Sequence, residues 1–161
     1  MPMREMAGKH ALRRQLARHS PLIIFAGLCV ILAAISPDFR GTGNLQQVAL
    51  RTCVVAIMAV GQILVILTAG IDLSVGSVAA LAGVVSGLLM TKYHVPVPLA
   101  VLAGCASGAA CGAINGLLIT RGRIQPFIVT LGMMMVARGV PMLLTDATSV
   151  FNLPQNFKYL G

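Results

Sequence analysis

The chain has 161 residues, of which 57% are apolar and only 10% are charged. Soluble domains average roughly 45–50% apolar and about 25% charged residues, so this composition argues against a soluble enzyme, and it excludes a disordered chain. The net charge of +8 would suit a nucleic-acid partner only if basic residues were interleaved along one face. Here they gather at the ends and at short joins, so we expect a lipid bilayer and no nucleic acid as partner.

Long runs without Asp, Glu, Lys or Arg divide the chain. They cover residues 19–37, 52–71, 73–91, 93–120 and 124–137, and the last continues past Arg138 to residue 145. A helix of about 20 residues crosses a hydrocarbon core of about 30 Å. Four runs are long enough, and the fifth is long enough if Arg138 lies near an interface or faces protein. We therefore predict an all-α integral membrane protein with about five transmembrane helices.

In chain order, we predict a basic cytoplasmic tail, a transmembrane bundle and a polar outer tail. The tail covers 1–19, the bundle covers 20–145, and the outer tail covers 146–161. The predicted spans are about 20–36, 47–69, 75–91, 98–120 and 125–145. A cleaved signal peptide is the alternative for the first run, which follows a basic segment; its length and the further spans favour a retained helix.

Orientation follows from the basic residues. If every span crosses, the amino end and the turns at 70–74 and 121–123 share one side, which holds seven Lys or Arg, against five on the other side. Positive charge favours the cytoplasmic side. We expect the amino end in the cytoplasm and the tail at 146–161 outside.

Small residues form stripes on two predicted spans. In lipid, such residues let helix backbones approach closely. Packing within a bundle is one interpretation, and a sliding surface for gating is the other. The stripes consist of Ala79, Gly83 and Gly87 in the third span, and Gly104, Gly108, Gly112 and Gly116 in the fourth.

Asp72 is an acidic residue between two long apolar runs, flanked by Gly70, Ser74 and Gly76. Glycine permits positive φ and broken helix geometry. Aspartate is also a good helix N-cap, so one interpretation is a cap on the third span. The other is a discontinuous helix that lines a pathway, where irregular backbone faces protein or water.

Polar side chains also interrupt the apolar spans, namely Gln62 and Thr68 in the second and Asn115 in the fourth. Such residues face protein or a cavity when they lie within hydrocarbon. Hydrogen bonding between helices is one explanation, and contact with a hydrophilic solute is the other. With Asp72 and Ser74, these residues are our candidates for a substrate pathway.

Residues for catalysis or metal binding are scarce. The four cysteines fall in apolar runs without metal-ligand spacing, and the three histidines are scattered. No phosphate-binding loop or pair of catalytic carboxylates occurs among the four acidic residues. We therefore expect no metal, no cofactor and no enzymatic activity in this chain.

Several stretches resemble one family of membrane proteins. The stretch from Ala56 to Ser77, which contains GIDLSVGS at 70–77, resembles the signature of ribose/xylose/arabinose-type permeases of bacterial ABC sugar importers. Further similar stretches are Ser36–Phe39 with Asn44–Leu45, Gly112–Gly116, Gly122–Gly132 and Arg138–Gly139. The resemblance covers nearly all of residues 20–161.

The resemblance implies a subunit that passes a monosaccharide across the membrane. Its implied partners are an ABC ATPase subunit, a periplasmic sugar-binding protein, and a second permease copy or the missing carboxy-terminal half. Family members are about twice as long, with about ten spans, so the chain resembles an amino-terminal half. We expect such a half to be truncated and unable alone to couple to the ATPase.

Two other functions remain possible from the sequence. The glycine stripes suit a self-associating membrane scaffold or pore-like bundle without an ATPase. A membrane enzyme is the third possibility, which the shortage of ionisable residues disfavours.

Overall fold

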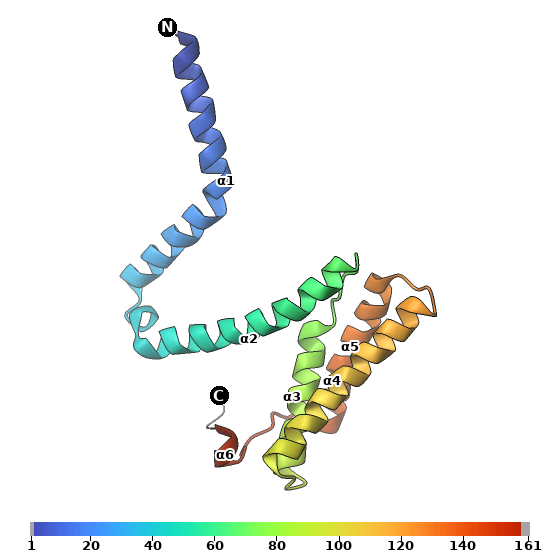
Figure 1. The fold of residues 1–161 in the computed structure, drawn as a ribbon. Helices are drawn as coiled ribbons and strands as arrows, with labels where there is room; N and C mark the ends of the chain where they lie inside the picture. The colour runs from blue at the N-terminus through green and yellow to red at the C-terminus, as the bar shows by residue number, and fades with distance from the viewer. Residues whose placement is uncertain (1, 159–161) are drawn as a thin grey trace. The chain divides into compact units, whose positions relative to one another are not determined.

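The computed structural model describes residues 2–158, with side chains described from residue 19 to residue 157. In this part of the chain the backbone forms helices and turns, without strands (Figure 1). The elements are α1 (Pro2–Ile35), η1 (Asp38–Arg40), α2 (Thr42–Leu67), α3 (Val75–Thr91), α4 (Val97–Thr120), α5 (Pro126–Leu144) and α6 (Gln155–Lys158). The fold is all-α, as predicted.

The chain divides into two compact units, Met1–Thr52 and Cys53–Gly161. The first holds α1, η1 and the start of α2, and the second holds the remainder of α2 with α3–α6. The basic segment that we expected as a tail is helical from Pro2 and is continuous with the first apolar run, since both belong to α1. The long uncharged runs are thus all represented by helices.

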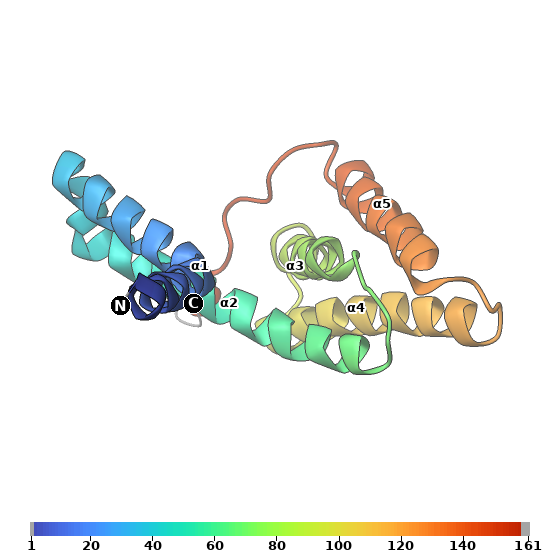
Figure 2. The same ribbon diagram turned by 90° about the horizontal axis from the view of Figure 1, so that it is seen from above.

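Within the second unit, α3 packs against both α4 and α5, and α4 also contacts α5. Both ribbon views place the three helices next to one another (Figures 1 and 2). Few large apolar side chains are buried among them, because much of the contact uses small residues. The buried apolar residues are Leu81, Met90, Ala100, Val129, Met133 and Ala137.

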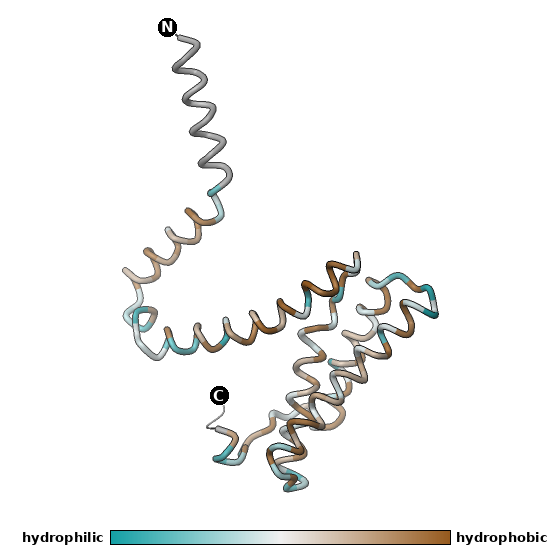
Figure 3. Tube along the Cα trace, in the orientation of Figure 1, coloured by the Kyte–Doolittle hydropathy of each residue, from teal (hydrophilic) through white to brown (hydrophobic). Residues whose placement is uncertain are grey.

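Among the residues that the structure describes, three helices are long and apolar enough to cross a membrane, namely α2, α4 and α5. Two shorter apolar helical stretches, His19–Ile35 and Val75–Thr91, have 17 residues or fewer, the lower end of the length that spans hydrocarbon. Figure 3 shows apolar residues along the helices and hydrophilic ones at the turns. Exposed apolar surface of this extent suits lipid or further helices. That all five helices cross the membrane stays a prediction.

A proline marks the start of α5, and a left-handed residue marks the end of α2. Pro126 is the first residue of α5, where a missing N–H is tolerated. After α2, Ala69 has φ of 57°, the N–H of Ala69 donates to the Ile66 carbonyl, and the N–H of Gly70 donates to the Val65 carbonyl. This pair of bonds is a Schellman ending. The chain then runs without regular structure until α3.

Candidate functional site

The segment between α2 and α3 (68–74) is held in place by side chains of several helices. From α4, the Asn115 amide Nδ2 donates to Ser74 Oγ at 3.2 Å. From α5, Thr130 Oγ1 donates to the Ile71 carbonyl at 3.1 Å. Both contacts join residues far apart in sequence, so they fix the 68–74 segment against the two helices.

A third side chain reaches the same segment from α2. Gln62 Nε2 donates to the carbonyl of Asp72 at 3.2 Å. The 68–74 segment lacks the hydrogen bonds of a helix, and a buried backbone carbonyl without a partner is unfavourable. The amide of Gln62 and the hydroxyl of Thr130 therefore supply two of the partners that irregular backbone needs.

Asp72 and Ser74 form a local turn at the start of α3. The carboxylate Oδ1 of Asp72 accepts from the Ser74 N–H at 2.7 Å and from Ser74 Oγ at 2.6 Å. Ser74 is the N-cap residue of α3 and is 1% exposed. We had considered Asp72 as the cap itself. The structure instead places it two residues earlier, where its charge still lies near the positive end of the helix dipole.

Two buried acceptor atoms have no hydrogen-bond partner among the described residues, Gln62 Oε1 and Asn115 Oδ1. Asn115 is 6% exposed, so bulk water does not satisfy its oxygen. Buried polar atoms are nearly always hydrogen-bonded, because a buried unsatisfied acceptor is unfavourable by about 1–3 kcal/mol. Both oxygens therefore lack the partner that a buried acceptor needs, and one of the two residues, Asn115, also lines a cavity.

The cavity that Asn115 lines is beside the 68–74 segment and has a volume of about 460 Å³. The end of α2, the second half of α4 and the start of α5 enclose it. Its lining residues are Val65, Thr68, Gly70, Ile71, Asp72, Gly112, Asn115, Gly116, Ile119, Thr120, Pro126 and Thr130. A volume of this size is in the range of small-molecule sites. We call this space the Asn115 cavity.

The structure separates the predicted pathway residues into two groups. Thr68, Asp72 and Asn115 line the Asn115 cavity, whereas Gln62 and Ser74 do not. Gln62 and Ser74 instead hold the 68–74 segment through the hydrogen bonds described above. Their assignment to a substrate pathway stays a prediction.

The two glycines expected near the helix break have different surroundings. Gly70 lies in the 68–74 segment, but the described glycines have no positive φ, and Ala69 takes that conformation instead. A Cβ on Gly70 would lie 3.3 Å from Val65 Cγ1, so close approach to α2 explains the glycine better than φ does. Gly76 is inside α3, with open space around it.

The small-residue stripes have several kinds of neighbour. A Cβ on Gly104 would collide with Ser86 Oγ and would lie 2.6 Å from the Ala82 carbonyl oxygen, so α3 and α4 approach each other closely there. Gly108 allows an ordinary contact with Val78, and Gly87 packs against Val150. Ala79 is exposed, and Gly83, Gly112 and Gly116 have no such neighbour within 4 Å. The stripe on α4 thus packs at one end and lines the Asn115 cavity at the other.

Thr130 is a residue of this site that the sequence analysis did not select. It is 2% exposed and bonds to the 68–74 segment. Its position, four residues after Pro126 in the apolar first half of α5, was the available signal. A single hydroxyl in an apolar run is ambiguous, because it also satisfies itself on its own helix.

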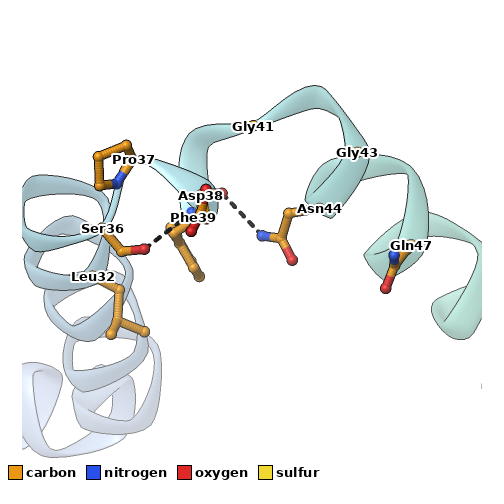
Figure 4. A pocket seen from close by; sticks show the side chains of 9 residues that line it. All are labelled: Leu32, Ser36, Pro37, Asp38, Phe39, Gly41, Gly43, Asn44 and Gln47. Atoms are coloured by element: carbon orange, nitrogen blue, oxygen red, sulfur yellow. Dashed lines mark hydrogen bonds between the residues drawn. The ribbon is translucent and has the colours of Figure 1, made fainter.

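A second recess lies in the first unit, between the end of α1 and the start of α2 (Figure 4). It has a volume of about 690 Å³ and is lined by residues between 32 and 47. Its hydrogen bonds join near neighbours, as when Asn44 Nδ2 donates to the Phe39 carbonyl at 2.9 Å. None of its lining residues is buried, so it is a weaker candidate than the Asn115 cavity.

Among the described residues, no group of three or more His, Cys, Asp or Glu side chains could hold a metal ion. Asp72 is the sole charged residue that lines the Asn115 cavity. The chemistry available there is hydrogen bonding by a carboxylate, an amide and hydroxyl groups.

Residues 44–158 match the sequence model of a family described as branched-chain amino acid transport system / permease component. The match includes α3–α5 and the entire 68–74 segment. No solved structure gives a significant match to the chain.

Among curated relatives, the ribose import permease protein RbsC of Escherichia coli K12 is 45% identical over 135 residues, which are 84% of this chain and 42% of that protein. The D-allose transport system permease protein AlsC of the same organism is 36% identical over 87% of this chain and 43% of its own length. The fructose import permease protein FrcC of Rhizobium meliloti is 50% identical over 59% of this chain and 25% of its own length. The chain therefore spans less than half the length of these relatives.

Proposed function

The chain belongs to the family of branched-chain amino acid transport system / permease components, and from this premise we propose that it is part of a permease that imports a monosaccharide. The observation that carries the proposal is its 45% identity to a ribose import permease over 84% of the chain. It is thus a multi-pass membrane protein and not an enzyme. Because the chain spans 42% of that relative, we assign transport to the permease that contains these residues.

We propose sugar over amino acid as the transported class, although the family description names branched-chain amino acids. The names of the similar proteins include ribose, D-allose, fructose and L-arabinose. These relatives match by sequence along most of the chain, and their names agree on sugars as the transported class. The named sugars also supply a defined set of substrates for testing.

The proposed partners follow from the same relatives. An ABC ATPase subunit would hydrolyse ATP, and a periplasmic sugar-binding protein would deliver the substrate. A second permease copy, or the segment that matches the remaining length of the relatives, would complete the pathway. We also propose that coupling to the ATPase requires that remaining segment.

A self-associating scaffold was the alternative that the glycine stripes suggested. It would use the stripe on α4 as a continuous contact surface. Gly112 and Gly116 instead line the Asn115 cavity, and Gly104 is already in contact with α3. This arrangement favours the permease, in which Gln62, Thr68, Asp72, Ser74 and Asn115 form or support the pathway.

A chimeric permease tests the function. The aligned 135 residues of the E. coli ribose permease would be replaced by those of this chain, in a strain that lacks its own copy. We expect ATP-dependent uptake of at least one of the four named sugars, and no uptake when the ATPase subunit is absent. A chimera that reaches the membrane but transports none of the sugars would contradict the proposal.

We further propose that the chain lies in the bacterial inner membrane with its amino end in the cytoplasm, because the side with the denser basic residues faces inward. Single cysteines would be introduced into a variant that lacks the four native ones. Lys92→Cys should react with an impermeant maleimide from the periplasm, and Arg123→Cys only after the cytoplasm is opened. The opposite pattern would invert the topology.

A further inference from the structure

We propose that Arg138, on the exposed face of α5, forms an ion pair with an Asp or Glu carboxylate on a transmembrane helix of the segment that completes the permease. This inference rests on the proposed function, because that segment is the part of a permease that matches the remaining length of the relatives. It names the surface of this chain that the segment covers. Its starting observation is a charged side chain without a partner in an apolar helix.

Arg138 lies within α5 and is exposed. Among the residues that the structure describes, no side chain or backbone group forms a hydrogen bond or ion pair with its guanidinium group. Asp72 is held by Ser74, and the neighbouring Ile71 carbonyl is bound by Thr130, which is about 12 Å along α5 from Arg138. The counter-charge for Arg138 therefore comes from outside the described part of the chain.

The position of Arg138 along α5 places it at the depth of the hydrocarbon core. α5 is one of the helices long and apolar enough to cross a membrane. Its 19 residues extend for about 28 Å, so a core of about 30 Å uses the entire helix. Arg138 lies about 9 Å before the helix ends at Leu144. Arginine at such a depth almost always faces protein or a water-filled cavity and has a partner there.

Contact with lipid phosphate groups is the alternative, and the direction of the side chain opposes it. Long side chains on a helix point back toward its amino-terminal end, which is Pro126 in α5. The nearer end, at Leu144, lies in the opposite direction. The first bonds of the Arg138 side chain thus lead away from the nearer headgroups, so a partner within the core explains the residue better.

The face of α5 that carries Arg138 has the pattern of a helix contact. Leu131, Met135, Arg138 and Met142 follow one another at intervals of four, three and four residues, so they share one face, and all four are exposed. The other side of α5 packs within the bundle. The buried residues there are Val129, Thr130, Met133 and Ala137.

Two glycines beside this stripe leave room for another helix. Gly132 and Gly139 each follow a residue of the stripe, and a Cβ on either would have no such neighbour within 4 Å. Small residues let helix backbones approach, and polar groups then bond across the contact. A carboxylate is the side-chain group that matches the fork of a guanidinium group. Because this chain spans 42% of the ribose permease, we assign the carboxylate to the remaining segment.

The test measures whether this chain retains that segment. The full chain, with a purification tag, would be co-expressed with the part of the E. coli ribose permease that follows the residues matched by this chain, and purified in mild detergent. The variants are Arg138→Leu, Arg138→Lys and Arg138→Glu. Arg40→Leu, which removes an exposed arginine from η1 outside the predicted spans, is the matched control.

We expect the parent and Arg40→Leu to retain the segment equally, and Arg138→Lys to retain part of it. Arg138→Leu should lower the retained amount by about tenfold, because the acid of the segment is then buried without a counter-charge. Arg138→Glu should lose the segment, and Lys in place of one Asp or Glu of the segment should restore it. This exchange of charges tests the pair even if Arg138→Leu fails to fold, which circular dichroism measures.

Other outcomes overturn the inference. Retention by Arg138→Leu at the level of the parent would leave lipid phosphate as the partner, and a loss that no exchange restores would mean that Arg138 binds something other than a carboxylate. A parent that retains an untagged second copy of itself instead of the segment would assign the face to contact between copies.

The sugar uptake assay separates this inference from the proposed function. Uptake by the chimera, together with retention that Arg138→Leu leaves unchanged, would reject the ion pair alone. A charge pair that is lost and restored by exchange, in a chimera that transports none of the named sugars, would reject the transport function alone.

Discussion

Helix α2 and the α3–α5 group are both apolar, but they bury very different things. α2 has no buried residue, and the hydroxyl of its Thr52 bonds within the helix, to the Val48 carbonyl. The α3–α5 group buries serines, an asparagine and a threonine, and two of these bond across long sequence separations. The two regions are thus similar in apolar composition, but only the α3–α5 group has buried side chains.

The difference shows which residues create packing in a membrane protein. Lipid tails solvate an apolar side chain as well as another helix does, so apolarity alone gives no reason for two helices to associate. Small residues that allow close approach, and polar groups that need partners, supply that reason. The α3–α5 group has both kinds at its contacts, and the predictions below remove them in turn.

The largest effect should come from Gly104→Ala. The added Cβ would lie 2.6 Å from the Ala82 carbonyl oxygen and would collide with Ser86 Oγ. The backbone oxygen cannot rotate away, so α3 and α4 must separate, and we expect a loss of about 3 kcal/mol, the upper range for overpacking. The midpoint of unfolding by SDS, followed by circular dichroism, measures it.

Two alanine substitutions provide matched controls. Gly83→Ala in α3 and Gly61→Ala in α2 both place the methyl group in open space. Because alanine favours a helix over glycine by about 1 kcal/mol, neither should destabilise. Equal destabilisation at positions 83 and 104 would contradict the close approach of α3 and α4 at Gly104.

A smaller effect is expected from Thr130→Val, which keeps the shape of the side chain and removes its bond to the Ile71 carbonyl. Hydrogen bonds between membrane helices average about 0.6 kcal/mol and reach about 1.7 kcal/mol. Since Thr130 is 2% exposed, we expect a loss of about 1 kcal/mol. Hydrogen exchange at the amides of residues 68–74 should also accelerate.

Thr120→Val is the control for this substitution. Its hydroxyl is exposed and bonds only to the Gly116 carbonyl of the same helix. We expect little change in stability and none in exchange over 68–74. If both variants accelerated exchange equally, Thr130 would have no special role in holding the segment.

The helices could be predicted from the sequence because each is marked by residues that are consecutive along the chain. Uncharged runs and prolines locate α3 at Val75–Thr91 and the start of α5 at Pro126, close to the expected bounds. The contacts between α3, α4 and α5 could not be predicted from the spacing of residues along the chain. Thr130 and Asn115 are each a polar residue in a mostly apolar run, and only the position of the 68–74 segment reveals what they bond.

The glycines show the same limit. Evenly spaced glycines on α4 indicate one face, but not what covers it along its length. Gly104 lies against α3, whereas Gly112 and Gly116 line a cavity. At the helix break, the sequence favoured glycine for positive φ, yet Ala69 takes it, because the hydrogen bonds of the Schellman ending determine which residue is left-handed.

Substitutions of Asp72 separate its charge from its hydrogen bonds. Asp72→Ala removes the acceptor for the Ser74 N–H and hydroxyl, and we expect a loss of about 1 kcal/mol, similar to loss of a helix cap. Asp72→Asn keeps an acceptor oxygen, and asparagine caps about as well as aspartate, so its stability should be near that of the parent.

Sugar uptake by the chimeric permease then tests the charge itself. Uptake that Asp72→Asn leaves unchanged would mean that Asp72 serves the turn at α3 and that its charge has no part in the pathway. Reduced uptake at unchanged stability would assign the charge to the pathway. Equal destabilisation by both substitutions would contradict the turn geometry.

The smallest effect, and the one that should stabilise, is expected from Ala69→Gly at the end of α2. Ala69 has φ of 57°, a conformation that disfavours a residue with a Cβ by roughly 1–2 kcal/mol. Glycine removes this strain but gains freedom in the unfolded chain, worth about 0.4–1 kcal/mol, so the net gain should be about 0.5 kcal/mol. Unfolding by SDS measures it against Ala79→Gly, which places glycine at an exposed position within α3 and should destabilise by about 1 kcal/mol. Destabilisation of the same size at both positions would mean that Ala69 is not left-handed, and the Schellman ending that directs the chain into the 68–74 segment would be wrong.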